Sequence, residues 1–138
     1  MKILAIDLGD VRTGVAISDN TEFLASPLGT IYEADRDLLL QKIIDIVAKH
    51  NVKKIVLGVP KNMDGSEGES AQKSYHFAEI LCKKSGVEVS FQDERGTTLE
   101  ASNYLNASAI YGEKRKHVID SVAATIILQS YLDSKRSS

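Results

Sequence analysis

The sequence predicts an α/β protein built on a five-stranded mixed sheet with the strand order 3-2-1-4-5 and helices on both faces. Three short β-rich runs open the chain, and their connections are too short for parallel crossovers. From Asp35 onward, helical and β-type patterns alternate along the chain. Right-handed crossovers then allow the fourth strand to pair beside the first, with the fifth strand outside it.

The first three strands are predicted to form an antiparallel meander. "KILAID" (residues 2–7) and "GVAISD" (residues 14–19) are short β-rich runs joined by a glycine-containing turn. "EFLASPLGTIY" (residues 22–32) supplies the third run, and Pro27 and Gly29 interrupt it. Because proline cannot donate to a strand ladder, this run suits an edge strand or a bulge.

A helix that covers one sheet face is predicted next. It begins at Asp35, and its apolar residues recur at helical spacing while its polar residues, Arg36 among them, lie mostly opposite. "KKIVLGVP" (residues 53–60) then supplies the fourth strand. Its uninterrupted apolar run is typical of a buried central position, and Pro60 ends it.

The fifth strand follows a second helix. "KNMDGSEGES" (residues 61–70) is a polar, glycine-bearing loop, and Ser66 with Glu69 three residues on predicts a capping box for this helix. The helix reaches to about Ser85, where Gly86 stops it. "VEVSFQ" (residues 87–92) alternates in polarity, as a half-buried strand does.

Two further helices complete the predicted chain. Thr97 and Glu100 form a second capping-box pattern, which starts a helix that continues through Leu105. The last helix carries an apolar stripe and runs from near Lys114 to Leu132. We expect residues 1–138 to form a single domain, with residues 134–138 as a frayed tail.

The composition favours a cytoplasmic protein that has no membrane partner. No apolar run is long enough to span a bilayer, and the N-terminus lacks the regions of a secretory signal. The single cysteine, Cys82, excludes an internal disulfide framework and fits a reducing compartment. Because Cys82 falls in a helical apolar pattern, we expect a small, buried or half-buried side chain.

Charge is unevenly distributed along the chain. The net charge of −2 is not typical of a strong nucleic-acid binder, but residues 95–138 hold six basic and four acidic side chains. Lys114, Arg115 and Lys116 stand together in this segment. They could form a local patch that contacts phosphates, or simply a solvated helix start.

Asp7 is the first candidate functional residue. It ends the first strand, which is central in the predicted sheet, and α/β sheets commonly place ligands at the carboxyl ends of their strands. Burying an ionised carboxylate costs roughly several kcal/mol unless the group is paired or binds a metal. The alternative is that Asp7 accepts hydrogen bonds from the backbone of the following glycine turn.

A second candidate acid follows the fifth strand in "FQDERGTT". This strand runs parallel to the first in the prediction, so it delivers Asp93 and Glu94 to the same edge as Asp7. Successive side chains point to opposite faces, and we favour Glu94 as the inward one, with Asp93 in reserve. The alternative is an ordinary polar strand end in which Arg95 is an ion-pair partner.

The third candidate is Asp120 in the last helix. Its neighbours one turn along, Ala123 and Ala124, are small and would let the helix approach the sheet closely. That approach would bring the Asp120 carboxylate toward the strand ends. The alternative is an acid on the solvent edge of an amphipathic helix.

Three acids from distant parts of the chain would therefore converge at one place. Clustered carboxylates repel one another, and a hard divalent cation with oxygen ligands, Mg²⁺ or Mn²⁺, is the usual compensation. Two such ions about 4 Å apart could activate a water and stabilise the leaving oxygen of a phosphodiester. The pattern predicts a metal-dependent nuclease.

Four motifs follow one another along the chain: "AIDLGDVRTGVAISD", "VLGVPKNMDGSEG", "DERGTT" and "IDSVAATIILQSYLD". Together they resemble the YqgF/RuvX family of pre-16S rRNA nucleases and Holliday junction resolvases, within the RNase H-like superfamily. The resemblance implies an RNase H-like fold, a divalent metal and cleavage of structured nucleic acid. It carries the family's catalytic and metal-binding acids onto Asp7, Glu94 and Asp120. Two departures are Gly96 after "DER", in place of an apolar residue, and the absence of an acid in "VLGVP".

Several basic residues are candidates for contacts with the nucleic acid. Arg12 lies five positions beyond Asp7 and could contact a phosphate or form a surface ion pair. Arg95 and the basic residues 114–116 are the other candidates for this interface. The expected partners are structured RNA, in particular pre-rRNA, or branched DNA, and the ribosome is a further candidate. The protein would act as a monomer or a homodimer.

Three other functions compete with rRNA maturation. The first is resolution of Holliday junctions in branched DNA. The second is an RNA-binding ribosome-assembly factor whose site is idle. The third is a phosphate-binding ATPase, because "DLGDVRTG" also resembles the first phosphate loop of actin-type and sugar-kinase folds.

Overall fold

The computed structural model describes residues 1–60, 67–93 and 113–137. Five strands form one sheet in the order β3-β2-β1-β4-β5, which confirms the predicted strand order. The strands are β1 (Lys2–Asp7), β2 (Arg12–Ser18), β3 (Ala25–Tyr32), β4 (Val52–Val59) and β5 (Glu88–Asp93). The first three form the expected antiparallel meander, while β4 pairs parallel with both β1 and β5.

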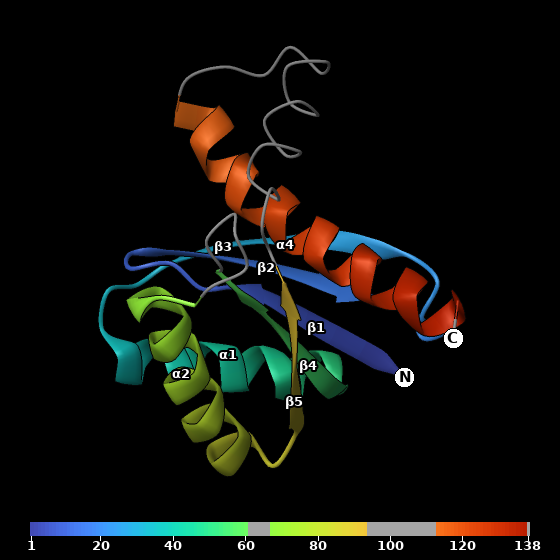
Figure 1. Ribbon diagram of the computed structural model, residues 1–138, viewed down its shortest axis with the longest axis horizontal. Coiled ribbons are helices and arrows are strands. Elements are labelled where there is room, and N and C mark those ends of the chain that lie inside the picture. Colours follow the sequence, from blue (N-terminus) through green and yellow to red (C-terminus); the bar gives the residue numbers. More distant parts are fainter. Residues whose placement is uncertain (61–66, 94–112, 138) are drawn as a thin grey trace.

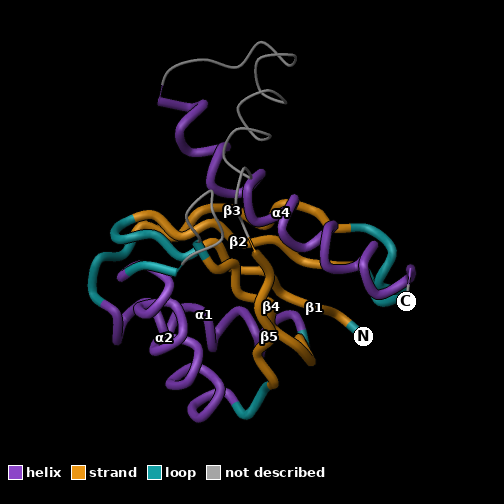
Figure 2. Tube along the Cα trace, viewed as in Figure 1, coloured by secondary structure: helices purple, strands orange, loops and turns teal. Residues whose placement is uncertain are grey.

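Helices cover both faces of this sheet, as predicted. Helix α1 (Arg36–His50) and helix α2 (Glu69–Ser85) lie on one face, and helix α4 (Glu113–Ser137) crosses the other (Figure 1). The N-terminal amino group of Met1 and the side chain of Lys135 both pair with Glu22, so the two chain ends lie close together. The loops that join the elements lie at the edges of the three layers (Figure 2). None of the helices, within the described ranges, is long and apolar enough to cross a membrane.

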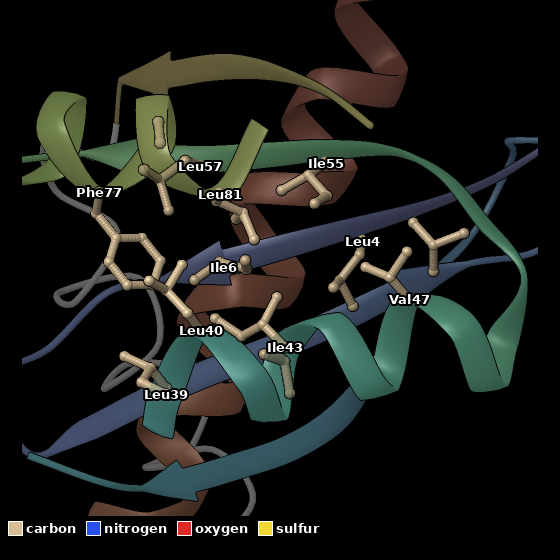
Figure 3. Close-up of a cluster of buried hydrophobic side chains, with 13 residues drawn as sticks. Leu4, Ile6, Leu39, Leu40, Ile43, Val47, Ile55, Leu57, Phe77 and Leu81 are labelled. Carbon is tan, nitrogen blue, oxygen red and sulfur yellow. The ribbon is translucent and has the colours of Figure 1, made fainter. Parts of the chain in front are cut away.

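Strand alternation divides the core of the protein into two clusters. Leu4 and Ile6 of β1 point to the α1/α2 side, where Leu57 of β4 and Phe77 of α2 join them (Figure 3). Ala5 points to the opposite side and packs in the cluster that includes residues 124, 127, 128 and 132 of α4. Successive residues of β1 therefore face different helix layers, as the two-residue period of a strand requires.

The ends of α1 and α2 follow local capping rules, with one difference from the sequence prediction. Asp35 caps α1 by accepting hydrogen bonds from the backbone N–H groups of residues 37 and 38, at 2.9 and 3.1 Å. Gly86 ends α2 with a φ of 72°, as expected. The predicted Ser66–Glu69 capping box was wrong, because α2 begins at Glu69 with Gly68 as its N-cap and no capping side chain.

Helix α4 is longer than the sequence pattern indicates. The apolar stripe ends at Leu132, and residues 134–138 are predicted as a frayed tail, yet the helix continues through Ser137. In this last part of the helix, Lys135 forms an ion pair with Glu22 of the loop between β2 and β3 at 3.4 Å. Its amino group also lies 5.5 Å from the centre of the ring of Tyr131, four residues earlier on the same helix.

Two other predictions concern Cys82 and the helix expected after the fifth strand. Cys82 is exposed on α2, so the expectation of a buried or half-buried thiol was wrong. It occupies the solvent side of a helix whose apolar stripe, which includes Ala78 and Leu81, faces the sheet. The predicted helix from Thr97 through Leu105 lies outside the described residues.

Candidate active site

Asp7 ends the central strand β1, at the carboxyl edge that the parallel strands share. It pairs with Gly14 of β2, and its side chain is half-buried. Asp7 follows Ala5 by two residues, so both lie on the face of the sheet that α4 covers. The chain therefore delivers a carboxylate to the α4 side of a strand whose preceding four residues are fully buried.

Glycines stand beside Asp7 on both neighbouring strands. Gly14 is its direct partner on β2, and on β4 Gly58 follows Leu57, the partner of Ile6. Both glycines are buried in the sheet. Because neither carries a side chain, β2 and β4 place no side chain beside the Asp7 carboxylate at these two positions.

Strand β5 brings Asp93 to the same edge, but on the other face. Asp93 pairs with Val59 of β4 and is exposed. It shares its face with Phe91, two residues earlier, whose ring packs edge-on against Tyr75 of α2 at 4.9 Å between centroids. Asp93 thus lies on the α2 side of the sheet and Asp7 on the α4 side. Glu94 lies outside the described residues.

Asp120 belongs to α4, one helical turn before Ala124. Ala124 is fully buried against β1, in the same cluster as Ala5. Farther along α4, Tyr131 lies 5.3 Å from the amino group of Lys54, near the start of β4. The helix therefore runs antiparallel to β1 and β4, and its earlier turns lie toward the carboxyl edge. The side chain of Asp120 lies outside the described residues.

The structure thus brings Asp7 and Asp93 to one edge, while the side chains of Glu94 and Asp120 stay untested. Among the residues that are described, no group of three or more Asp, Glu, His or Cys side chains could hold a metal ion. The donor type at Asp7 suits Mg²⁺ or Mn²⁺, because both prefer carboxylate oxygens.

Among the basic residues that were predicted to contact nucleic acid, Arg12 is the one whose side chain is described. Arg12 begins β2 and is exposed; it precedes Gly14 by two residues and so lies on the same face as Asp7. Arg95 lies outside the described residues. Lys114, Arg115 and Lys116 belong to the first turns of α4, and their side chains also lie outside the described residues.

A tight loop connects Asp7 to β2, and the sequence prediction missed the residue that holds it. A Cβ at Gly9 would lie 2.0 Å from the carbonyl oxygen of Arg12, so this turn admits only glycine. Arg36, which was expected on the polar side of α1, donates from Nη1 to the Gly9 carbonyl oxygen at 2.8 Å. No local pattern in the sequence could have identified this contact, because Arg36 and Gly9 are 27 positions apart.

Comparisons with known sequences agree with this architecture. A family model described as "RuvX: Holliday junction resolvase" matches residues 1–134. A protein of Caldanaerobacter subterraneus subsp. tengcongensis is 45% identical over 139 residues, covering 100% of both chains. A Bacillus subtilis protein is 43% identical over 136 residues, covering 97% of this chain and 99% of its own. Both carry the description "Putative pre-16S rRNA nuclease".

Solved structures share the fold at low sequence identity. The Thermus thermophilus RuvC complex with a Holliday junction substrate has a TM-score of 0.63 at 9% identity, covering 100% of this chain and 97% of that one. The fowlpox virus resolvase bound to Holliday junction DNA has a TM-score of 0.60 at 14% identity, covering 98% and 99%. With its RNase H-like fold and a family match over almost its whole length, the chain belongs to the RuvX family of Holliday junction resolvases.

Proposed function

We propose that this protein is a divalent-metal-dependent endonuclease that hydrolyses phosphodiester bonds in structured RNA, in the 5′-end maturation of pre-16S rRNA. The observation that carries the proposal is the position of Asp7. A half-buried carboxylate ends the central strand between two glycines, on the face that α4 crosses. The names of relatives that are 43% and 45% identical supply the substrate class.

The metal ligands in this proposal are Asp7, Glu94 and Asp120. Carboxylates from a strand end and a helix provide the hard oxygen donors that Mg²⁺ or Mn²⁺ takes. When bound, the metal supplies an activated water and charge stabilisation for the leaving oxygen. Asp7 would fix the position of the site, because it pairs with Gly14 of β2 and directly follows Ile6, which pairs with Leu57 of β4.

The choice of Glu94 over Asp93 follows from strand alternation. Asp93 shares a face with Phe91, on the α2 side, whereas Asp7 lies on the α4 side. An acid that acts together with Asp7 must reach the α4 side. This requirement supports the neighbouring acid, Glu94, as the ligand that the "DER" motif contributes.

The nucleic acid would approach across the α4 side of the carboxyl edge. Arg12 lies on that face, two residues before Gly14 on β2, where its guanidinium can pair with a phosphate. Arg95 and the cluster Lys114, Arg115 and Lys116 are proposed as further phosphate contacts. Such a protein would work in the cytoplasm on pre-rRNA, free or within a ribosomal particle.

Resolution of branched DNA is the second candidate function. The description of the matching family and the two solved complexes with Holliday junctions favour it. Both substrates are polyanions, and phosphate contacts do not distinguish them. A resolvase that makes paired cuts would need two copies of the chain, so a homodimer is expected for this function and a monomer suffices for the first.

The test is a cleavage assay with matched substrates and variants. Wild-type protein, Asp7→Asn and Asp120→Asn are incubated with a pre-16S rRNA fragment and with a four-way DNA junction, in Mg²⁺, Mn²⁺ or chelator. We expect wild-type protein to cut the RNA only with metal, and both variants to lose cleavage while they keep the fold. The control is Asp45→Asn, an exposed carboxylate on the solvent side of α1, which should cleave normally.

Each alternative has its own result in this assay. Cutting of the junction in preference to the RNA would favour the resolvase. Salt-sensitive RNA binding without metal-dependent cleavage by the wild-type protein would favour an idle binding factor. Equal cleavage by wild-type protein and both variants would point to a contaminating nuclease and contradict the proposal.

A further inference from the structure

A cavity lies on the opposite face of the sheet from Asp7, at the same edge. It has a volume of about 560 Å³ and lies between the first turns of α1, the middle of α2 and the loop after β1. Its apolar wall includes Leu8, Phe77 and Ile80, and charged side chains from α1 and α2 complete it. Pockets that bind small ligands in other proteins have volumes of roughly 300–1,000 Å³, so this cavity is large enough for one.

Arg36 forms a fixed planar surface in the wall of this cavity. Its Nη1 donates to the Gly9 carbonyl oxygen at 2.8 Å, and its Nη2 lies 3.7 Å from Asp10 Oδ1. Its guanidinium carbon lies 6.0 Å from the centroid of the Phe77 ring. The side chain is 38% exposed, so the guanidinium is held in place and still accessible. Planar guanidinium groups stack on nucleobases.

The polar groups around the cavity complement the edge of a base. Asp10 presents a carboxylate that is 92% exposed and can accept hydrogen bonds from amino groups. Lys73 and His76, three residues apart on α2, offer donors. Apolar walls, a stacking surface and both donors and acceptors together match an unstacked nucleobase better than they match a purely apolar or purely anionic ligand.

The cavity offers less to the phosphates of a free nucleotide. The nearby start of α1 is a common place for phosphates, but Asp35 already accepts hydrogen bonds from the N–H groups of Asp37 and Leu38. The cavity is instead adjacent to the proposed cleavage site. Leu8 lines it, and Leu8 directly follows Asp7 in the chain.

We propose that this cavity accepts one unstacked nucleobase of the nucleic-acid strand that is cut at Asp7. The inference rests on the proposed nuclease function, and it adds a specificity-determining site to it. A base in the cavity and a phosphate at Asp7 would hold the strand from both faces of the sheet edge. Cleavage would then depend on an unpaired base at a fixed distance from the cut.

The experiment is an abasic scan of binding in the presence of chelator, so that it does not depend on cleavage. Single abasic residues are placed one at a time along a pre-16S rRNA fragment, and binding to the wild-type protein is measured by fluorescence anisotropy. We expect one position to weaken binding by about tenfold, as the loss of one stacked base does elsewhere, while the other positions have little effect.

Variants then assign that position to the cavity. Lys73→Ala and Ala34→Trp, which places a large ring in the cavity wall, should bind intact RNA as weakly as the wild-type protein binds the abasic RNA. The matched control is Lys83→Ala. Lys73 and Lys83 both lie on α2 and both form an ion pair with a glutamate four residues earlier, but only Lys73 lines the cavity.

The possible failures are distinguishable. An abasic scan without a sensitive position, from a protein that cleaves RNA, would overturn the inference and leave the nuclease intact. The inference would also be overturned if the same abasic position still weakened RNA binding in Lys73→Ala and Ala34→Trp. If free nucleoside monophosphates compete with the RNA and no abasic position weakens binding, the cavity binds a free nucleotide and not a base of the strand. That result would also overturn the inference. If one position is sensitive and the variants assign it to the cavity, but the protein does not cleave RNA, the result would support base binding in the cavity and contradict the proposed nuclease function.

Discussion

Arg36 reaches from the first turn of α1 to the loop after β1 and donates a hydrogen bond to the carbonyl oxygen of Gly9 at 2.8 Å. Gly9 is two residues beyond Asp7, and its turn leaves no room for a Cβ. The helix layer on one face of the sheet therefore holds the loop that begins at the proposed catalytic carboxylate. Besides its proposed contact with a nucleobase, Arg36 would act as a positioning residue for Asp7 in the proposed active site, because it holds the backbone of this loop.

Arg36→Ala is expected to lower kcat by about tenfold to a hundredfold, because small displacements of a catalytic group are costly. Hydrogen exchange in residues 8–11 should become faster, while the midpoint of thermal unfolding changes little. Arg36→Lys, which can keep one donor, should recover part of kcat. The control is Lys42→Ala on the same helix, where Lys42 pairs with Glu33 at 2.9 Å. Unchanged exchange in the loop together with normal cleavage would contradict the positioning role.

Gly58→Ala tests whether the metal and the substrate bind beside Asp7, on the α4 side of the sheet. The added methyl group would stand on the α4 side of β4, next to the carboxylate, without removing any charge. We expect a loss of metal-dependent cleavage and of the thermal stabilisation that Mn²⁺ gives to a protein that binds it. Gly68→Ala is the control, since a Cβ there meets nothing within 4 Å. Normal cleavage by Gly58→Ala would show that the metal and substrate lie elsewhere.

The sequence allowed the sheet order and the position of Asp7 to be predicted, because both depend on local patterns. Alternation, apolar runs and connection lengths identify the strands, and an acid at the end of a buried strand is visible in "KILAID". The handed crossover rule then places β4 beside β1. The roles of Gly14 and Gly58 depend on register between strands, which no single segment encodes.

The features that were missed or wrong depend on contacts between distant residues. Arg36 lies 27 positions from Gly9, so its hydrogen bond to that loop has no local signal. Helix α4 continues beyond its apolar stripe, and there Lys135 pairs with Glu22 of the loop between β2 and β3, 113 positions earlier in the chain. The capping box at Ser66 was a sound local pattern, but α2 begins three residues later, at Glu69.

Gln129→Ala is expected to destabilise the protein by about 1–2 kcal/mol, because Gln129 joins α4 to the edge strand with two hydrogen bonds. Its Oε1 accepts from the Ala25 backbone N–H, and its Nε2 donates to the Phe23 carbonyl oxygen, both at 3.0 Å. Chemical denaturation measures the loss in the free energy of unfolding. Gln41→Ala is the control: Gln41 and Gln129 each contact an aspartate four residues on, but Gln41 is exposed on α1. Equal losses in both variants would show that the link between α4 and the edge strand is unimportant.

Asp19 should make stability depend on acid pH through the loop between β2 and β3. A hydrogen bond from the Thr21 hydroxyl at 2.6 Å, and then one from the Phe23 backbone N–H at 2.9 Å, hold the pKa of Asp19 below its ordinary value of 3.8. A carboxyl group whose pKa is lower in the folded state stabilises the protein above the unfolded pKa, and this contribution is lost as the pH falls through the folded pKa.

Asp19→Asn removes this titration, so the advantage of the wild-type protein should be largest near neutral pH and should shrink below about pH 3.8. Urea denaturation at a series of pH values measures the difference in the free energy of unfolding. Thr21→Val keeps the carboxylate but removes the leading cause of the lowered pKa, and it should reduce the pH dependence without abolishing it. A difference between wild type and Asp19→Asn that stays constant from neutral to strongly acidic pH would mean that Asp19 titrates alike in the folded and unfolded chains, and the hydrogen bonds of this loop would then contribute nothing to stability.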